Sequence, residues 1–486
     1  MPDAMVPEKG PKAASSDSGT THSNSRQYRH KICMVSDFFY PRLGGVEMHL
    51  WSLSQNLLRL GHKVIVVTHA YNDRKGIRFM TNGLKVYYMP LPFIEDIIPF
   101  LRNSTDQLSM PTFQAWLPLF RNILIREDIN IVHAHQCVSA LTHASLMHAQ
   151  TMGYHTVYTD HSLFGLNDFA GIHLNKILKF TLTAVDYSIC VSHTCRENLV
   201  LRASLDPKRV AVIPNAVDTN KFVPDMRVRN RIGSNTINIV VISRLVYRKG
   251  IDLLVDIIPK VCQQDSRVNF IIGGDGPKRL LLEEMIEKYE LYQRVELLGQ
   301  VPHVNVREVL VKGHMFLNCS LTESFCIAIL EAASCGLYIV STAVGGIPEI
   351  LPNDMVSFAE RTSSSSLIKA VLNSLNNVDK INPLEHHKRV KKMYHWRHVA
   401  ERTSKLYDSL KKRRPLYFYE RIVAMLKTGH FFGLITIVIV ALDMILLELI
   451  KWIDPRADIE LAPDFPCKLY ARNLKQIHIE DKMRKG

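Results

Sequence analysis

The sequence predicts an α/β protein with two successive domains of mostly parallel sheet, followed by one long apolar helix. Three observations carry this prediction. The chain has 486 residues, enough for two or three domains of about 150 residues each. Short apolar runs alternate with segments of helical spacing, first within 31–217 and again within 218–412. Residues 431–450 form an apolar run that holds only two charged residues.

The first domain is predicted to begin after a disordered tail, residues 1–30, which is rich in Ser, Thr, Lys and Arg. A buried strand over 32–36 leads into a helix over 46–60, which Gly61 ends. Strands that alternate with helices form a mostly parallel sheet covered on both faces. The remaining strands of this domain are predicted at 63–68, 130–135, 155–159, 187–191 and 210–213.

The second domain follows a polar stretch, 225–235, which is a candidate linker. We interpret the whole as two Rossmann-like domains that face one cleft. Ligands of such sheets lie beyond the carboxyl ends of the strands. The strands of the second domain are predicted at 238–242, 268–272, 295–298, 314–318 and 338–341.

The apolar run near the carboxyl end predicts a transmembrane helix over 429–450, because about 20 apolar residues span a bilayer core. Asp443 weakens this prediction, since a carboxylate at that depth costs a few kcal/mol. A carboxylate there would be protonated or paired with another membrane segment. A long buried helix, or one that lies on a surface, is the alternative.

Flanking charge predicts the orientation. Residues 411–427 hold six Lys or Arg residues, whereas 451–467 hold two. By the positive-inside rule, the basic segment 413–428 and the large amino-terminal part face the cytosol, and 451–486 form a lumenal tail. We expect no cleavable signal peptide, because the first 30 residues contain no apolar core.

Composition narrows the class of partner. The formal net charge is +14, which favours anionic ligands or an anionic membrane face. We predict no nucleic-acid partner, because the chain shows neither a zinc-ligand array nor an RNA-stacking signature. The nine cysteines are scattered without a Cys-x-x-Cys pair, which indicates a reducing compartment and buried structural roles.

Charged residues follow two of the predicted strands. Arg244 and Lys249 come after the strand that ends at Ile242, where both can reach a diphosphate. Glu323 is predicted at a helix start, with Glu331 inside that helix. Eight residues of helix span about 12 Å, which suits contacts to a sugar at one end and a ribose at the other. The alternatives are a solvated loop for Arg244 and Lys249, a helix-capping carboxylate for Glu323 and an exposed helical residue for Glu331.

Glycine pairs occupy three other turns between strands and helices. Gly44 and Gly45 allow close approach of a ligand and leave helix N–H groups to meet an anion. Gly274, Gly276 and Gly346 occupy similar positions later in the chain and suit phosphate or base contacts. Each pair is also compatible with a simple tight turn.

One histidine is a candidate for the cleft. His161 ends a predicted strand and can exchange a proton near neutral pH or bond a sugar hydroxyl. We expect His133 and His135 to point to opposite faces of their strand, so that at most one faces the cleft. The chain contains no Asp-x-Asp motif, so we predict no metal and no cofactor. Arg244 and Lys249 would then stabilise a leaving diphosphate themselves.

These residues resemble the motif set of the retaining glycosyltransferases of family 4, which have the GT-B fold. The resemblance covers about 31–412. More narrowly, the chain is similar to the family of phosphatidylinositol N-acetylglucosaminyltransferase catalytic subunits. The similar stretches are 33–41, 158–165, 213–218 and 243–250.

The resemblance implies transfer of N-acetylglucosamine from UDP-GlcNAc to phosphatidylinositol with retention, the first step of glycosylphosphatidylinositol-anchor synthesis. It implies that Arg244 and Lys249 bind the diphosphate, Glu331 the ribose and Glu323 the donor sugar. Gly45 would approach the donor phosphate, and His161 would hold the sugar or assist proton transfer. Partner subunits in a complex of the endoplasmic reticulum membrane are also implied, with the catalytic domains in the cytosol.

Two other functions remain open from the sequence. Another family-4 lipid glycosyltransferase, such as a phosphatidylinositol mannosyltransferase, would share the diphosphate motifs. A diverged, non-catalytic scaffold is the second, although it would need none of these charged residues. The acceptor site is also open: Leu174, Ile177, Leu178 and Phe180, beside Lys176 and Lys179, are either a membrane-facing amphipathic helix or core.

Overall fold

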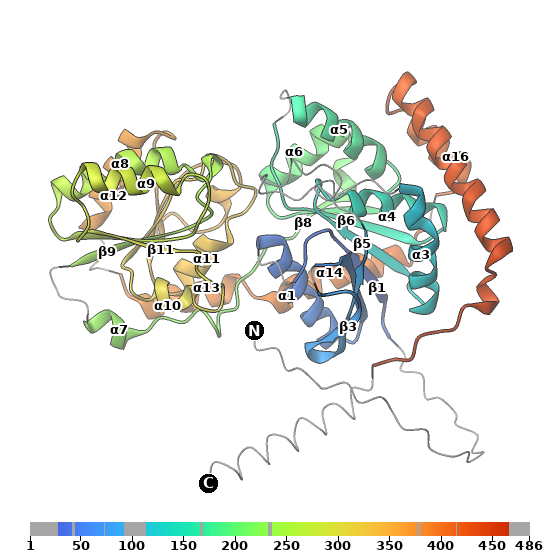
Figure 1. Cartoon of the computed structure of the whole chain (residues 1–486), viewed down its shortest axis with the longest axis horizontal. Helices are drawn as coiled ribbons and strands as arrows, with labels where there is room; N and C mark the ends of the chain where they lie inside the picture. The colour runs from blue at the N-terminus through green and yellow to red at the C-terminus, as the bar shows by residue number, and fades with distance from the viewer. Residues whose placement is uncertain are drawn as a thin grey trace, which may run out of the picture.

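The computed structural model describes residues 28–40, 44–71, 73–91, 113–165, 169–231, 236–376, 378, 381–414 and 416–465. Two α/β domains lie side by side, and a long helix runs along the outer face of the first (Figure 1). Most of the predicted tail 1–30, and all of 466–486, lie outside the described residues.

The first domain is built on an eight-stranded sheet in the order β3-β4-β2-β1-β5-β6-β7-β8. All neighbouring strands are parallel except β3, which is antiparallel to β4. The sequence did not predict β3 and β4. The strands are β1 (Lys31–Val35), β2 (Lys63–His69), β3 (Gly76–Met80), β4 (Leu84–Met89), β5 (Ile131–His135), β6 (His155–Asp160), β7 (Tyr187–Cys190) and β8 (Val210–Val212).

Helices cover both faces of this sheet, which explains the continuous apolar strands. Cys33 and Val35 of β1 pack in a cluster with α3 and α4, whereas Ile32 and Met34 pack in one with α1 and α14. The helices of this domain are α1 (Gly45–Arg59), α3 (Phe113–Arg126), α4 (Ala140–Thr151), α5 (Phe169–Leu182), α6 (His193–Ala203) and the returning helix α14 (Trp396–Leu410).

The second domain has six strands in the order β11-β10-β9-β12-β13-β14, all parallel. They are β9 (Ile237–Ile242), β10 (Val268–Gly273), β11 (Val295–Gly299), β12 (Met315–Asn318), β13 (Tyr338–Thr342) and β14 (Val356–Ala359). The helices are α7 (Met226–Arg231), α8 (Ile251–Gln264), α9 (Arg279–Lys288), α10 (Val306–Leu310), α11 (Ile327–Ser334), α12 (Ser364–Leu375) and α13 (Pro383–Met393).

The returning helix α14 crosses the predicted domain boundary. The sequence placed it in the second domain, 218–412, but it packs on α1 of the first. Its Trp396 and Tyr407 are buried there. The helical spacing of its apolar residues does not indicate which sheet they face, so the sequence could not place this helix.

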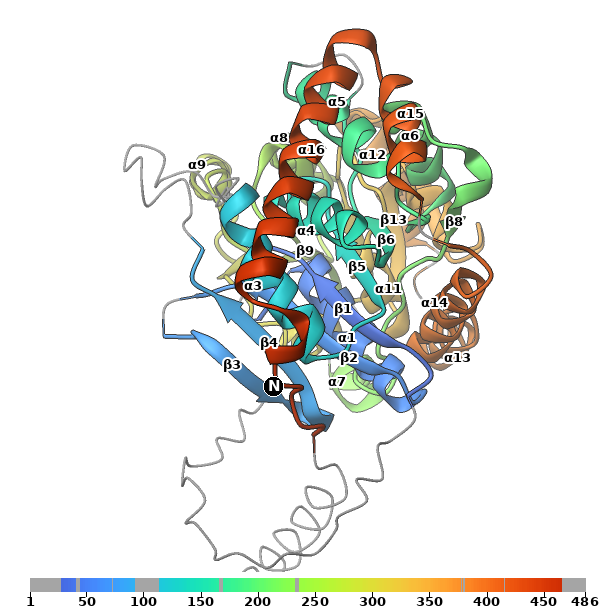
Figure 2. The ribbon, with the colours of Figure 1, turned by 90° about the vertical axis from the view of Figure 1, so that its right-hand side faces the viewer.

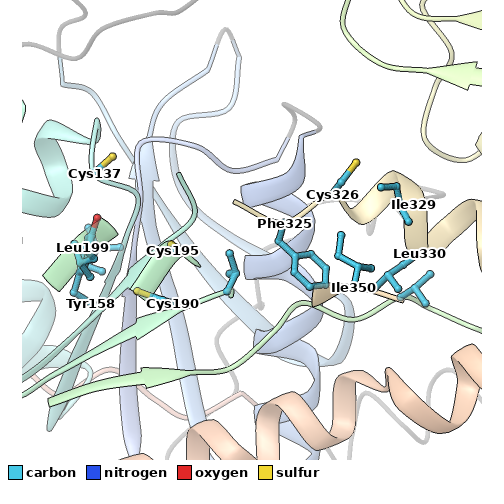
Figure 3. Packing of buried hydrophobic residues seen from close by; sticks show 14 of the residues in the cluster. Cys137, Tyr158, Cys190, Cys195, Leu199, Phe325, Cys326, Ile329, Leu330 and Ile350 are labelled. Atoms are coloured by element: carbon cyan, nitrogen blue, oxygen red, sulfur yellow. The ribbon is translucent and has the colours of Figure 1, made fainter. Parts of the chain in front are cut away.

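The domain interface is partly apolar. One buried cluster contains Cys190 and Cys195 of the first domain together with Phe325 and Ile350 of the second, and Figure 3 shows these side chains on facing elements. A polar contact between the two domains lies beside this cluster. The Glu349 carboxylate accepts hydrogen bonds from the first backbone N–H groups of α6, 2.6 Å and 2.8 Å long, as a helix-capping carboxylate does.

The carboxyl-terminal part consists of α15 (Phe418–Leu426) and α16 (His430–Ile453). Figure 2 shows α16 lying across the face of the first domain, in front of α3 and α4. Among the described residues, one helix is long and apolar enough to cross a membrane, Gly433–Ile453. Eight of the nine cysteines lie in the described part, and all eight are free and buried, as predicted.

Candidate active site

Two loops pack against each other at the carboxyl ends of β9 and β10. A Cβ on Gly274 would lie 1.8 Å from the Ser243 carbonyl oxygen, and one on Gly276 would lie 2.6 Å from that of Leu245. The φ angles of these glycines are +140° and +152°, which other residues rarely adopt. The structure therefore gives both glycines a role in holding the loop that carries Arg244, and their predicted contact with a ligand stays a prediction.

Lys249 and Glu323 form an ion pair at this end of the sheet. The Lys249 ammonium donates to Glu323 Oε1, and the Ser320 hydroxyl donates to the same oxygen over 3.0 Å. Burial lowers the pKa of Lys249, but the Glu323 carboxylate outweighs it, and the pKa lies above its usual value. The Arg244 charge acts in the opposite direction on Lys249, so these two cations lie within electrostatic reach of each other.

Glu323 does not begin the helix, which corrects the sequence interpretation. Helix α11 begins at Ile327, and Glu323 lies in the loop before it. The span of about 12 Å, which assumed a continuous helix from Glu323 to Glu331, therefore does not apply. A neighbouring loop holds this backbone out of the helix, because the Glu323 carbonyl accepts a hydrogen bond from the Gly346 N–H over 2.9 Å.

Glu331 is buried within α11, and its partner was not predicted from the sequence. Its Oε1 lies 3.0 Å from His303 Nε2, and His303 is in turn bonded by the Lys221 ammonium, 3.1 Å from Nδ1. Burial lowers the pKa of Lys221, and the Glu331 charge opposes that shift. His303 follows β11. Its position after a strand was the one feature of the sequence that could have distinguished it from the other histidines, of which the chain has 21 in all.

The first domain contributes three histidines that lie together. His161 Nε2 is 3.2 Å from His135 Nδ1, and the ring of His49 meets His161 edge-on at 4.6 Å. His49 Nδ1 bonds Asn215 Oδ1 over 2.7 Å. The sequence singled out His161 alone, whereas His49 lies on α1 and Asn215 follows β8.

The prediction that His133 and His135 point to opposite faces is wrong. Residues two apart on a strand share a face, and these two rings lie 4.2 Å apart. Both are fully buried, with His133 bonded to Tyr407 and Thr159.

Burial sets the charge state of this histidine group. Desolvation, followed by the neighbouring imidazoles, holds the pKa of His161 and of His135 well below 6.5. It lowers the pKa of His49 to about 4. At neutral pH the rings are therefore uncharged, and His161 serves as a hydrogen-bond donor or acceptor rather than as a proton-donating imidazolium.

The amino ends of α1 and α11 lie close together between the two domains. A Cβ on Gly45 would meet one side chain only, Ile327 of α11, at 3.9 Å. Gly44 is the N-cap of α1. On the second domain, a Cβ on Gly346 would lie 2.1 Å from the Ser324 carbonyl and 2.6 Å from the Ser192 hydroxyl of the first domain. Gly346 thus sits in the domain contact.

The histidine group also has the spacing of metal ligands. One nitrogen from each of His49, His135 and His161 lies within 4.8 Å of the others. Neutral imidazoles are suitable metal ligands. The prediction that this protein needs no metal remains untested, and we derive no step that uses one.

Known proteins resemble this chain over most of its length. Residues 69–168 match the model of the family described as PIGA (GPI anchor biosynthesis), and 223–392 match that of glycosyl transferases group 1. A phosphatidylinositol N-acetylglucosaminyltransferase subunit from Arabidopsis thaliana is 52% identical over 92% of this chain and 96% of its own length. The chain belongs to this family. The subunit of the same name from Homo sapiens is 48% identical over 90% of this chain and 88% of its own.

Solved structures of lower identity confirm the fold. A sucrose-phosphate synthase from Thermosynechococcus elongatus has a TM-score of 0.63 at 18% identity, covering 79% of this chain and all of its own. An Anabaena HepE structure in complex with UDP has a TM-score of 0.60 at 16% identity, over 78% of this chain and all of its own. These neighbours confirm the predicted GT-B fold.

Proposed function

We propose that this chain transfers N-acetylglucosamine from UDP-GlcNAc to phosphatidylinositol with retention, the first step of glycosylphosphatidylinositol-anchor synthesis. Relatives that are about half identical over nine-tenths of the chain bear the name of that transferase. The structural observation that carries the proposal is the Lys249–Glu323 pair at the carboxyl end of a Rossmann-like sheet. It offers a cation to a diphosphate beside a carboxylate suited to sugar hydroxyls.

On the donor side, Arg244 and Lys249 bind the diphosphate and stabilise the charge that develops as UDP leaves. Glu323 bonds the donor sugar, which competes with Lys249 for its carboxylate. Glu331 bonds the ribose, and His303 orients it from the other side.

The glycines bring the backbone close to the donor. Gly45 lets the backbone at the amino end of α1 approach the donor phosphate, which takes the place of the Glu47 carboxylate beside Gly44. Gly274 and Gly276 support the loop that carries Arg244. Gly346 lets its loop reach the first domain, so that both sides of the cleft meet the same substrate.

On the acceptor side, neutral His161 bonds the transferred sugar and is itself held by His135 and His49. Retention needs no protein nucleophile in this scheme. The departing diphosphate oxygen takes the proton of the acceptor hydroxyl while the new glycosidic bond forms on the same face of the sugar. The low pKa of His161 supports this route, because a neutral imidazole is not a ready source of protons at pH 7.

We further propose that the protein works in a complex at the endoplasmic reticulum membrane, with both catalytic domains on the cytosolic side. The names of the relatives, which call them subunits, support a complex. The finer prediction, a single crossing by 429–450 with a lumenal tail, remains a prediction.

The reaction is tested in membranes of cells that express this chain in place of their endogenous subunit. Labelled UDP-GlcNAc, UDP-glucose and GDP-mannose are supplied separately with phosphatidylinositol. We expect a labelled glycolipid from UDP-GlcNAc alone. Labelling from GDP-mannose instead would indicate a mannosyltransferase. Absence of labelling, with the partners shown to be assembled, would overturn catalysis by this chain.

A further inference from the structure

One lysine beside the donor side of the cleft is held by a histidine. The Lys221 ammonium lies 3.1 Å from Nδ1 of His303, and it donates a second hydrogen bond, 2.8 Å long, to the backbone carbonyl of the same residue. Lysines are mostly exposed in folded proteins. Lys221 is partly buried instead and is fixed at two points of one neighbouring residue.

The backbone around Lys221 is fixed as well. The chain passes from β8 of the first domain to α7 of the second, and Asp218 begins a turn in this connection (Figure 1). Its carboxylate accepts a hydrogen bond from the Lys221 N–H over 3.4 Å. The next carbonyl, that of Phe222, accepts one of 2.6 Å from the Ser334 hydroxyl on α11. The turn is therefore tied to the helix that carries Glu331.

Phe222 supports the His303 ring by packing. The Phe222 side chain is buried, and its ring meets that of His303 edge-on, with 5.8 Å between the ring centres. The Lys221 ammonium lies 5.1 Å from the centre of the Phe222 ring. Arg307 of α10 donates to the carbonyl of Val223 over 2.9 Å, which holds the following residue. These contacts leave the imidazole one orientation.

The lysine also determines which nitrogen of His303 carries the proton. An ammonium group only donates hydrogen bonds, so Nδ1 of the ring accepts with its lone pair. In the neutral ring the proton is then on Nε2, which donates to Glu331 Oε1 over 3.0 Å. The direction of donation therefore runs from Lys221 to His303 and from His303 to Glu331.

This series of hydrogen bonds holds the Glu331 carboxylate in one orientation. Its Oε1 is occupied by the imidazole, and within the described part of the chain no side chain bonds Oε2. Hydrogen bonds in series polarise one another, so the ammonium strengthens the Nε2–H donor. Burial lowers the pKa of Lys221 and the Glu331 charge opposes that shift, which puts the two charges within electrostatic reach across the ring.

We propose that Lys221 is a positioning residue for donor binding, which acts through His303 to hold the Glu331 carboxylate toward the ribose hydroxyls of a nucleoside diphosphate. The inference deepens the proposed function and rests on its assignment of Glu331 to the ribose. It brings a residue of the connection between the domains into donor recognition.

The same connection also reaches the first domain's side of the cleft. Asn215 Oδ1 accepts a hydrogen bond from His49 Nδ1 over 2.7 Å. One short stretch of chain, 215–222, thus contacts both the histidine group and the residues that hold Glu331. Substitution of the Lys221 side chain removes only the second contact, so it is the sharper point for a test.

The test measures recognition of the ribose hydroxyls in the purified complex. UDP and 2′,3′-dideoxy-UDP share the base and the diphosphate, so the ratio of their Kd values, measured by calorimetry, reports the contact to Glu331. For the wild-type chain we expect UDP to bind roughly tenfold or more tightly than the analogue, because hydrogen bonds to a charged group contribute at least that much.

Lys221→Met keeps most of the side-chain length and removes the ammonium group. We expect the preference for UDP to fall about fivefold, the effect of one ordinary hydrogen bond, with Kd for the analogue unchanged within about twofold. Unchanged binding of the analogue also shows that the variant is folded. Lys312→Met, exposed after α10, is the matched control and should keep the wild-type preference.

Two further variants separate positioning from general support of the loop. His303→Gln offers one donor and one acceptor, so it should recover most of the preference that His303→Ala loses. Lys221→Met combined with Glu331→Gln should show no further loss beyond Glu331→Gln alone, because the carboxylate that Lys221 positions is already gone.

The outcomes distinguish this inference from the reaction itself. Equal weakening of UDP and the analogue by Lys221→Met would overturn it, because the lysine would then act on the diphosphate or on the loop. An unchanged preference in Lys221→Met would overturn it while leaving Glu331 at the ribose. A wild-type chain that does not distinguish the two ligands would remove the ribose role of Glu331 as well. Transfer of the sugar is measured separately in membranes and does not depend on these results.

Discussion

The second domain's side of the cleft presents Arg244, Lys249, Glu323 and Glu331, with Glu323 in an ion pair with Lys249, whereas the first domain's side presents histidines that burial keeps neutral. Both sides lie at the carboxyl ends of parallel sheets, so the fold alone does not account for the difference. The substrate proposed above accounts for the difference. A diphosphate needs fixed positive charge as it leaves, while sugar hydroxyls need neutral hydrogen-bond partners.

The strongest test of the charged side is Lys249→Ala. Loss of one group that stabilises developing charge typically costs 10²–10³-fold, so we expect kcat/KM for UDP-GlcNAc to fall by about that factor. Transfer in membranes measures it. Lys260→Ala, exposed on α8, is the matched control and should behave as wild type. Similar losses in both variants would show that the effect is not specific to the site.

The neutral side is tested by His161→Ala. We expect kcat to fall by about 10²-fold, because a positioned hydrogen-bonding group is lost from the transition state, with little change in the KM for donor. His161→Gln keeps one donor and one acceptor and should recover part of the rate. A raised KM with unchanged kcat would place His161 among the donor-binding residues instead.

Glu331→Gln should act on donor binding alone. Hydrogen bonds to a charged group contribute about 1.5–3 kcal/mol, so we expect the KM for UDP-GlcNAc to rise by roughly tenfold or more. His303→Ala should give a smaller rise in the same parameter, because it acts through Glu331. Glu284→Gln, exposed on α9, is the control. Wild-type kinetics for Glu331→Gln would exclude the ribose role.

The neutral histidines make stability depend on pH. The folded pKa is about 4 for His49 and about 3 for His133, against 6.5 for the unfolded chain. The unfolded state therefore takes up protons first, and their contribution is complete above pH 6.5 and is lost as pH falls toward 4. Thermal unfolding of the purified complex should show Tm falling over that range. His49→Asn should reduce the slope; an unchanged slope would contradict this origin.

The contact between the two sides is tested by Glu349→Ala, with the smallest effect. Removing a capping carboxylate costs about 1 kcal/mol, so Tm should drop by a few degrees. Activity at low temperature should be nearly unchanged. Glu360→Ala, whose partner Lys369 is equally exposed, is the control for a surface carboxylate. A loss of transfer without a change in Tm would mean that the contact between Glu349 and α6 takes part in bringing the two domains together around the substrate.

Much of the fold could be predicted because strand and helix periodicity is local. The continuous apolar runs predicted the parallel sheets, and every predicted strand overlaps an observed one. Helix α14 could not be placed, because its apolar face fits either sheet and only tertiary packing chooses between them. Strand β3 was missed because its residues are largely exposed and do not form a buried run.

The site was predicted less completely. The sequence identified Arg244, Lys249 and Glu323 because they follow predicted strands, and residues after parallel strands lie at the edge of the sheet where ligands bind. His49 and His303 were missed because they lie among 21 histidines, and only the fold brings them to Asn215 and Glu331. The helix containing Asp443 shows the limit of hydropathy, since composition alone does not reveal that this carboxylate meets His148 of α4.

The most direct test of this comparison is the affinity of the purified complex for UDP, measured by calorimetry for Lys249→Ala and His161→Ala side by side. UDP carries the diphosphate without the sugar, so it isolates the charged side of the cleft. We expect Kd to rise by about 100-fold for Lys249→Ala and to stay within about twofold for His161→Ala. Equal weakening of UDP binding in the two variants would contradict separate roles for the charged residues of the second domain and the histidines of the first.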